Sequence, residues 1–317
     1  MKFKDLTTFK IGGSIRYFFS VDSLKDLVEK VQFSKTKKLP IFIIGEGSDI
    51  LVSDKYFNGV VIKYTENNIE INNNIVTAKA GVIWDKLVRF TVDNMLQGME
   101  CLSGIPGTVG ASPIQNIGAY GQELSDTFIS LKAYDVQNEK IVVFNKKKCK
   151  FGYRESIFKR KGYWQKYVIL EVSFKLKKVG GVDLLKCRND ILKLRKQKLE
   201  DPKKVPNAGS FFKNPFVSLN KKLDLVKKYS DMQFYPVKNK YKISAGFLIE
   251  KAGWKGRKMG PAQVSPKHAL ILTNPNGKSK FDDIKKLADS IIFDVYKLFG
   301  IKLEPEVQYI NTWLYSN

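Results

Sequence analysis

The stretch SGIPGTVGASPIQNIGAYG, residues 103–121, is the part of the chain from which the fold is inferred. It contains five glycines and two prolines, and no charged residue lies between Glu100 and Glu123. So long a neutral run is unusual, because 27% of the whole chain is charged. Glycine allows positive φ angles and lets the backbone approach a ligand closely. We therefore interpret residues 103–110 as a turn whose backbone faces a ligand.

A second glycine-rich turn, IGEGSD at residues 44–49, interrupts an apolar, strand-like run at 39–54. Successive backbone N–H groups in such turns bind phosphate oxygens without a charged side chain. A tight turn with a purely structural role is the alternative explanation for each turn taken alone. Neither turn matches GxGxxG or GxxxxGKS/T, which excludes Rossmann and P-loop nucleotide sites. Together the two turns are suited to enclosing a large, flat, anionic cofactor.

The composition is that of a globular protein. At 317 residues the chain is long enough for two or three domains, and 43% of its residues are hydrophobic. No apolar run reaches transmembrane length, and MKFKDLTTFKIGG at the N-terminus lacks the apolar segment of a secretory signal. Three scattered cysteines and a single histidine argue against a disulfide framework and a metal site. We expect a cytoplasmic protein.

The formal net charge of +24 has two explanations. One is a surface for nucleic acid or another polyanion, with an affinity that falls steeply as salt is added. The other is a generally lysine-rich composition, since the lysines are scattered and no arginine-rich arm or recognition motif occurs. We favour the second explanation and expect no nucleic-acid partner. A positive surface would still attract small phosphate-bearing ligands.

The periodicity of apolar residues predicts the secondary structure around the two turns. Helices are predicted at 22–38, 83–97, 183–199, 218–229, 245–252 and 281–299. Strands are predicted on both sides of the first turn, within 59–79, at 269–273, and as an antiparallel group at 129–136, 140–145 and 167–176. Residues 201–215 are predicted to be a loop because they are rich in turn-forming residues.

Six ordered strings carry a resemblance to a known family. They are IGEGSDILVSD (44–54), GMECLSGIPGTVGASPIQNIGAYGQEL (98–124), FGYRESIFK (151–159), NAGSFFKNP (207–215), AGFLIEKAGWKG (245–256) and FGIKLEPEV (299–307). Together they resemble the UDP-N-acetylenolpyruvoylglucosamine reductases, flavoenzymes of bacterial peptidoglycan precursor synthesis. The match extends from about Thr8 to Val307, and six motifs in order make it specific.

The resemblance implies an α+β fold of the vanillyl-alcohol-oxidase (PCMH) type. Two α+β subdomains would hold an extended FAD, followed by a C-terminal α+β substrate-binding domain. We place the first FAD-binding subdomain at 1–63, the second at 64–197 and the substrate-binding domain at 198–300. The segment 301–317 is expected to return to the first subdomain as a strand.

The resemblance also implies an activity. NADPH would reduce a non-covalent FAD, which would then reduce UDP-N-acetylenolpyruvoylglucosamine to UDP-N-acetylmuramate. The expected partners are NADPH and a UDP-sugar, with no membrane partner, and we expect a monomer. Neither glycine turn contains histidine or cysteine, so nothing indicates a covalent flavin link. Another flavin oxidase of the same fold is the competing hypothesis, and it would not need NAGSFFKNP or LEPEV.

Three residues receive catalytic roles from the resemblance. Arg154 would polarise the carboxylate of the enolpyruvyl group, for which a planar guanidinium is suited. From the sequence alone, a structural pair with Glu155 or another carboxylate is the alternative. Ser210 would be the proton donor, although without the resemblance a serine that satisfies its own turn is the simpler explanation. Glu306 would act beside Ser210. Glu304 is a much weaker candidate for this role.

The remaining site residues follow the two turns and the later motifs. Expected pyrophosphate contacts are Gly45, Gly47, Ser48 and Asp49, of which Asp49 stands where the family usually has asparagine. Contacts on the other side of the flavin are expected from Ile105, Pro106, Gly107, Thr108 and Gly110, with Asn116 and Gly118 near the isoalloxazine ring. Expected substrate contacts are Tyr120, Tyr153, Arg195, Lys198, Lys213 and Asn214.

One region departs from part of the family. Some members insert a long loop with a substrate-covering tyrosine before the helix that precedes GSFFKNP. Here that region is the short KKVGGVDLL (177–185), which has no tyrosine, so how the substrate is covered stays open. His268, in SPKHALILTN, begins an apolar strand and is expected to be packed rather than to act as a base.

Overall fold

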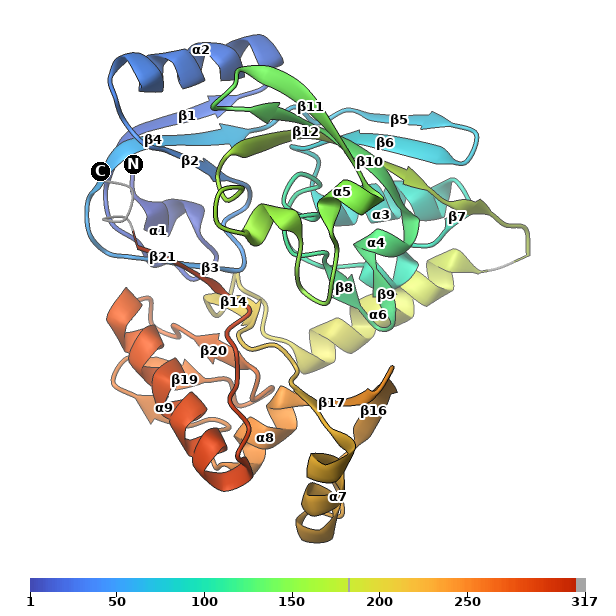
Figure 1. The fold of residues 1–317 in the computed structure, drawn as a ribbon, viewed down its shortest axis with the longest axis vertical. Coiled ribbons are helices and arrows are strands. Elements are labelled where there is room, and N and C mark those ends of the chain that lie inside the picture. Colours follow the sequence, from blue (N-terminus) through green and yellow to red (C-terminus); the bar gives the residue numbers. More distant parts are fainter. Residues whose placement is uncertain (182, 312–317) are drawn as a thin grey trace.

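Two groups of elements lie one above the other in the computed structural model, which describes residues 1–181 and 183–311 (Figure 1). The N-terminal group, blue to green, contains a three-stranded and a five-stranded sheet, and the C-terminal group, yellow to red, contains a four-stranded and a three-stranded sheet. No helix among the described residues is long and apolar enough to cross a membrane. The same residues contain no group of three or more acidic, histidine or cysteine side chains placed to hold a metal ion.

The first sheet of the N-terminal group is parallel. Its strands lie in the order β1 (Ile15–Val21), β4 (Phe57–Tyr64) and β2 (Ile41–Ile44). Helix α2 (Leu24–Thr36), which was predicted, connects β1 to β2. Strand β1 was not predicted, because its sequence IRYFFSV lacks the two-residue alternation of a half-buried strand. Its rings Tyr17 and Phe19 instead pack edge-on against Phe33 of α2.

The second sheet is antiparallel and has five strands. They lie in the order β11 (Lys140–Asn145), β10 (Phe128–Asp135), β12 (Tyr167–Lys175), β6 (Ile75–Lys79) and β5 (Ile69–Asn72). This confirms the predicted antiparallel group at 129–136, 140–145 and 167–176. Helix α3 (Trp84–Asp93) buries its apolar face against the same core.

One hydrophobic cluster lies beneath both sheets. It joins Val60 and Ile62 of β4 to Val76 of β6 and Trp84 of α3. The two predicted FAD-binding subdomains therefore share a core across the boundary that we drew between residues 63 and 64, and that boundary stays a prediction.

The C-terminal group consists of two small sheets and their helices. The larger sheet has the order β14 (Asn207–Ser210), β20 (Ile271–Thr273), β19 (Ala262–Val264) and β18 (Lys258–Met259), with α8 (Ala245–Lys251) and α9 (Phe281–Phe299) in the same core. The smaller sheet has the order β15 (Phe216–Val217), β17 (Lys240–Ile243) and β16 (Phe234–Val237), beside α7 (Leu219–Lys228). The loop predicted at 201–215 is wrong at β14, where the chain pairs with β20.

The remaining elements are mostly short. They are α1 (Phe3–Leu6), β3 (Ile50–Val52), β7 (Leu96–Gln97), η1 (Glu100–Leu102), β8 (Gly118–Ala119), β9 (Gln122–Glu123), α4 (Leu124–Thr127), α5 (Lys146–Cys149), η2 (Ile157–Lys159), β13 (Lys177–Lys178), α6 (Leu184–Lys198) and β21 (Gln308–Ile310). Of these, the 15-residue helix α6 and the strands β3 and β21 were predicted.

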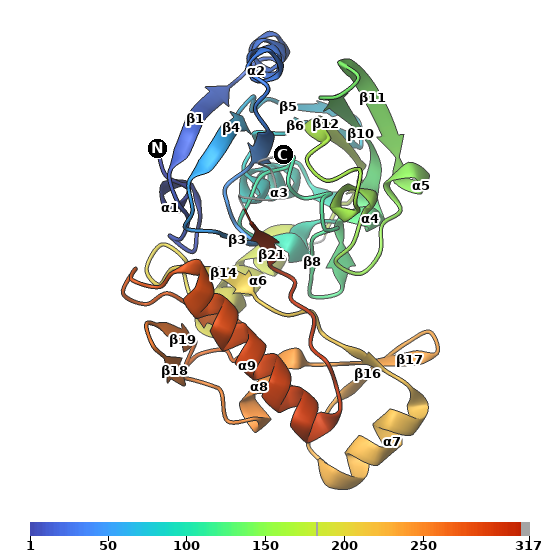
Figure 2. The same ribbon diagram turned by 60° about the vertical axis from the view of Figure 1, so that its left-hand side comes forward.

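The end of the chain returns to its beginning. After α9 the backbone rises past the C-terminal group, and β21 pairs in parallel with β3, as Figures 1 and 2 show. The N-terminal segment crosses in the opposite direction, from the N-terminal group into the C-terminal group, because Phe9 and Ile11 are buried in the C-terminal core. These two crossings hold the groups together along one side. Residues 312–317 of the predicted returning segment lie outside the described residues.

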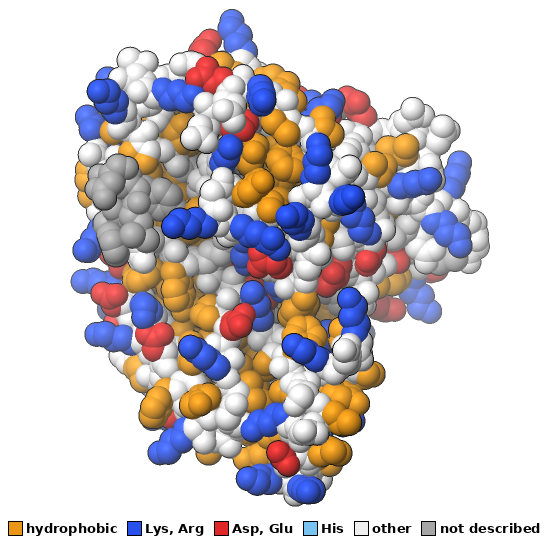
Figure 3. All heavy atoms as spheres, in the orientation of Figure 1, with side chains coloured by type: hydrophobic (Ala, Val, Ile, Leu, Met, Phe, Trp, Pro, Cys, Tyr) orange, Lys and Arg blue, Asp and Glu red, His pale blue; other side chains and the backbone are white. Residues whose placement is uncertain are grey.

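The basic residues form no single patch on the face drawn in Figure 3. Lysines and arginines are spread over that whole face and alternate with acidic and apolar side chains. This distribution agrees with a generally lysine-rich composition.

Candidate active site

A cavity of about 510 Å³ lies where the two groups of elements meet. Its wall combines both glycine turns with residues 208–210, 214 and 306 from the C-terminal part of the chain. The predicted site residues on this wall are Gly45, Gly47, Ser48, Asp49, Ile105, Pro106, Gly107, Thr108, Gly110, Gly118, Tyr120, Arg154, Arg195, Ser210, Asn214 and Glu306. All three predicted catalytic residues and most predicted cofactor contacts thus line one space.

The turn at 44–49 is held by the backbone of the N-terminal segment. The Thr8 N–H donates to the Gly47 carbonyl at 3.1 Å. Gly47 has a φ of +63°, and a Cβ at this position would lie 2.0 Å from the Leu6 carbonyl oxygen, so only glycine fits. The Ser48 hydroxyl is 3.5 Å from the Pro106 carbonyl oxygen, which links this turn weakly to the second one.

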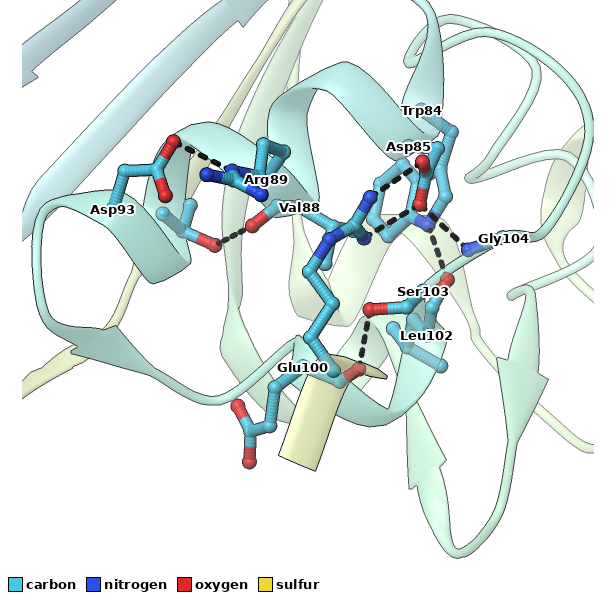
Figure 4. Close-up of polar contacts among 11 residues, drawn as sticks. Trp84, Asp85, Val88, Arg89, Asp93, Glu100, Leu102, Ser103 and Gly104 are labelled. Atoms are coloured by element: carbon cyan, nitrogen blue, oxygen red, sulfur yellow. Dashed lines mark hydrogen bonds and ion pairs between the residues drawn. The ribbon is translucent and has the colours of Figure 1, made fainter. Parts of the chain in front are cut away.

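The turn at 103–110 is held by side chains of two helices (Figure 4). The Gly104 N–H donates to Asp85 Oδ1 at 2.6 Å, and the Trp84 indole N–H donates to the Leu102 carbonyl at 3.1 Å. Arg188 of α6 donates two hydrogen bonds to the Asp85 carboxylate, each of 2.7 Å. Burial disfavours the ionised carboxylate, but the hydrogen bonds from Arg188 and Gly104 outweigh burial and lower the pKa of Asp85.

Arg154 is presented by a tight, strained turn. The Gly152 N–H donates to the Glu155 carbonyl at 2.9 Å, and Arg154 has a φ of +52°. For a residue other than glycine this conformation costs about 1–3 kcal/mol, and such strain clusters at functional sites. Its Nε lies 2.9 Å from Glu306 Oε1, and its Nη2 donates to the Gly118 carbonyl at 2.6 Å. The ion-pair partner of Arg154 is therefore Glu306, not Glu155.

Glu306 is fixed beside the strand that ends at Ser210. Its backbone N–H donates to the Phe211 carbonyl at 2.8 Å. Burial raises the pKa of the Glu306 carboxyl, although Arg154 and Lys159 oppose the shift. A raised pKa increases the protonated fraction of Glu306, which can donate a hydrogen bond as well as accept one.

Ser210 is the last residue of β14 and pairs with Ile271 of β20. The next two side chains, Phe211 and Phe212, are fully buried and fix the strand behind it. Gly209, with a φ of +77°, lets the chain bend before the serine. Among the described residues no group forms a hydrogen bond with the Ser210 hydroxyl, so the hydroxyl is available to a ligand in the cavity.

Comparisons with known proteins agree with this arrangement. A model of the FAD binding domain matches residues 15–145, and a model of the C-terminal domain of UDP-N-acetylenolpyruvoylglucosamine reductase matches residues 200–310. The UDP-N-acetylenolpyruvoylglucosamine reductase of Buchnera aphidicola subsp. Baizongia pistaciae is 40% identical over 97% of this chain and 98% of its own length. The chain belongs to the UDP-N-acetylenolpyruvoylglucosamine reductase family. It is therefore an FAD-dependent oxidoreductase.

Further members of the reductase family support the same assignment. The reductase of Bdellovibrio bacteriovorus is 37% identical over 94% of this chain and 95% of its own length. The crystal structure of the reductase from Thermus caldophilus matches with a TM-score of 0.74, over 98% of this chain and 97% of that chain, at 23% identity. The fold is thus the predicted α+β combination of an FAD-binding module and the C-terminal domain of this reductase family.

Three buried polar atoms on the cavity wall of this family member lack a hydrogen-bond partner within the described part of the chain. They are Asp49 Oδ2, Gln115 Oε1 and Arg154 Nε, whose N–H is not aligned with Glu306 despite the short distance. A buried polar atom left unpaired costs about 1–3 kcal/mol, so these atoms mark a place for a polar ligand. Apolar side chains such as Ile105 and Ile117 complete a wall that fits a flavin.

Three predicted contacts lie outside this wall but close to it. Tyr153 and Lys213 line a second cavity of about 580 Å³, which meets the first at Asn214. Asn116 is buried, and its side chain accepts the Ser125 N–H at 2.9 Å and donates to the Gly152 carbonyl at 3.1 Å. Asn116 thus holds the turn of Arg154 in place, and its contact with FAD stays a prediction.

Neither Lys198 nor His268 lines the first cavity. Lys198 is exposed at the end of α6, so its predicted substrate contact stays a prediction. Burial is the main cause that lowers the pKa of His268, and the charges of Lys255 and Lys198 add to it. The His268 Nδ1 accepts the Leu270 N–H at 3.2 Å, which agrees with the predicted packing role.

Four residues that support the site were not predicted from the sequence. Asp85 and Arg188 anchor the second glycine turn, and Gln115 and Lys159 surround the carboxyl group of Asp49. Lys159 and Gln115 fall inside recognised motifs, but each acts on residues far away in the chain. No local pattern could have assigned these roles.

Proposed function

We propose that this chain reduces UDP-N-acetylenolpyruvoylglucosamine to UDP-N-acetylmuramate, a step of peptidoglycan precursor synthesis, with non-covalent FAD and NADPH. The observation that carries the proposal is the common cavity wall of Arg154, Ser210 and Glu306 with both glycine turns. The names of the relatives support the substrate and the reaction.

The two glycine turns would hold the cofactor. Their N–H groups suit the pyrophosphate, and the absence of a side chain at Gly107, where a Cβ would meet only Ser48 Oγ at 3.5 Å, lets the backbone come close. When bound, FAD supplies the relay that accepts hydride from NADPH and passes it to the substrate. No cysteine or histidine stands on the wall among the described residues, so a non-covalent association is expected.

Arg154 and Glu306 would stabilise the charge that develops on the substrate. The enolpyruvyl double bond takes up a hydride at C3 and a proton at C2, and negative charge moves toward its carboxylate between the two events. A preorganised guanidinium beside a low-dielectric wall stabilises that charge without reorganisation. The pair with Glu306 and the bond to Gly118 fix the Arg154 side chain in advance. A protonated Glu306 would add a hydrogen bond to the same carboxylate.

Ser210 would deliver the proton to C2. A serine hydroxyl is a weak acid, so its position must be fixed and water must be kept away. The β14–β20 pairing and the buried Phe211 and Phe212 provide this rigidity.

The test separates the two half-reactions. In S210A, reduction of bound FAD by NADPH should continue, whereas its reoxidation by the enolpyruvyl substrate should slow by about 10²–10⁴. E306Q should slow the same reoxidation step. E304Q is the matched control, in which both half-reactions should keep the rates of the unaltered protein. Stopped-flow absorbance of the flavin under anaerobic conditions measures each step. Equal reoxidation rates in S210A and the unaltered protein would remove Ser210 from the mechanism.

A further inference from the structure

Part of the cavity wall contains none of the site residues predicted from the sequence. It consists of neighbouring residues of β2 and of the segment before β12, namely Ile43, Ile44, Tyr163, Trp164 and Gln165. All five belong to the N-terminal group, whereas Ser210 and Glu306 come from the C-terminal part of the chain. In FAD the pyrophosphate joins the flavin half to the adenosine half. With the flavin ring beside Ser210 and the pyrophosphate at the turn 44–49, the adenosine half is expected at this part of the wall.

Residues 160–166, which we call the strap, connect the two sheets of the N-terminal group. The strap leads from η2 into β12 of the five-stranded sheet, and its Trp164 N–H donates to the Arg160 carbonyl at 3.0 Å. The Trp164 side chain packs against a hydrophobic cluster that includes Phe42 and Ile44 of β2, in the three-stranded sheet. The strap thus crosses from one sheet to the other beside the cavity.

Gln165 fastens the strap to the three-stranded sheet through both groups of its side-chain amide. Its Oε1 accepts the Ile43 N–H, and its Nε2 donates to the Ile43 carbonyl at 3.3 Å. Because β2 is an edge strand in the order β1-β4-β2, Ile43 presents these backbone groups on the open side of the sheet. A primary amide offers an acceptor and a donor side by side, so it pairs with an edge strand as another peptide group would. Gln165 holds this position with a φ of +59°, which is uncommon outside glycine.

We propose that Gln165 is a positioning residue that keeps the strap closed over the adenosine half of FAD. The aromatic side chains of Tyr163 and Trp164 on the same wall offer a surface suited to a planar base. Without the two bonds of Gln165 the strap is closed in a smaller fraction of molecules, and the apparent affinity for FAD falls with that fraction. The inference rests on the proposed position of FAD and extends it to the half of the cofactor that takes no part in the reaction.

The test compares the dissociation constants of two flavins for the apoprotein, measured by flavin fluorescence. FMN is the probe that lacks the adenosine half. In Q165A the dissociation constant of FAD should rise by about 10- to 100-fold, since two hydrogen bonds that hold the strap are lost, whereas that of FMN should change little. The rate at which FAD dissociates should rise by a similar factor. Q137A is the matched control, because Gln137 is exposed on the neighbouring β10–β11 turn, and it should leave both constants unchanged.

A second variant serves if Q165A does not fold. Q165N keeps a neutral amide and tolerates the positive φ, but its side chain is one methylene shorter and cannot reach both groups of Ile43. It should therefore show the same selective loss of affinity for FAD.

The outcomes are distinguishable. If both variants weaken the binding of FAD and of FMN equally, the strap supports the fold rather than the adenosine half, and the proposal is overturned. Unchanged FAD binding in both variants also overturns it. If the unaltered protein binds neither flavin, the proposed position of the cofactor is wrong, and the proposed function fails together with this inference.

Discussion

The two glycine turns look alike in sequence, but they are held in different ways. The turn at 44–49 packs against the backbone of the N-terminal segment, where Gly47 leaves no room for a side chain. The turn at 103–110 is held by a hydrogen bond from Gly104 to Asp85, and Arg188 of α6 in turn holds the Asp85 carboxylate. The first turn depends on a missing side chain and the second on a half-buried ion pair. Substitutions at the two turns should therefore change stability and FAD affinity to different extents.

The largest effect is expected where the ion pair is broken. R188A leaves the Asp85 carboxylate half-buried without its partner, and we expect the free energy of unfolding to fall by about 3–5 kcal/mol. K193A is the matched control, because Lys193 is exposed on the same helix and its loss should change stability by less than about 0.5 kcal/mol. Urea denaturation measures both. Equal stability of the two variants would contradict the anchoring role of Arg188.

Acid provides an independent check of the same pair. The pKa of Asp85 is lowered in the folded protein, so its contribution to stability is complete above the ordinary value of 3.8. This contribution to stability is lost as the pH falls through the lowered pKa that Asp85 has in the folded protein. The difference in stability between the unaltered protein and R188A should thus shrink below about pH 4 and stay constant between about pH 5 and pH 8.

An alanine at each turn sharpens the contrast. G47A must strain a φ of +63° and move the Leu6 carbonyl, so we expect a loss of about 2–4 kcal/mol of stability together with FAD binding. G107A also strains its backbone, at φ +126°, but its Cβ would meet only Ser48 Oγ at 3.5 Å. We expect a smaller loss, of about 1–2 kcal/mol, with a clear loss of FAD affinity. Thermal unfolding and flavin fluorescence separate the two effects, and a greater destabilisation in G107A would reverse the comparison.

The smallest effect is expected at the link between the turns. The Ser48 hydroxyl lies 3.5 Å from the Pro106 carbonyl, at the limit of a hydrogen bond. S48A should change the free energy of unfolding by less than about 0.5 kcal/mol, whereas FAD affinity should fall if the hydroxyl contacts the pyrophosphate. A large loss of stability would mean that the turns support each other more than their geometry indicates.

Sequence patterns predicted the regular elements better than their arrangement. The helices α2, α3, α6, α7, α8 and α9 lie within the predicted ranges, because their periodicity is local. Strand β1 and the parallel sheet were missed, since aromatic packing against α2 replaced the usual alternation. The loop prediction at 201–215 was wrong at β14, because turn-forming residues do not reveal a pairing with a distant strand.

The partners of Arg154 show the same limit. From the sequence, Glu155 was as plausible a partner for Arg154 as any distant carboxylate. The left-handed turn around Arg154 directs its guanidinium across the cavity to Glu306 instead. The motifs placed Arg154 and Glu306 among the predicted site residues, and the folded chain brought the two side chains together.

Local features of this protein follow from its sequence alone: the helices, the existence of the two glycine-rich turns, and the ordered motifs of the reductase family. Each depends on residues that are close together in the chain, because φ angles and apolar periodicity are local properties. The bonds between Asp85 and Arg188, which are 103 positions apart, exist only in the folded chain, as does the buried environment of Asp49. Burial and the charges of distant neighbours determine whether a carboxyl group is ionised, and tertiary packing alone brings them together.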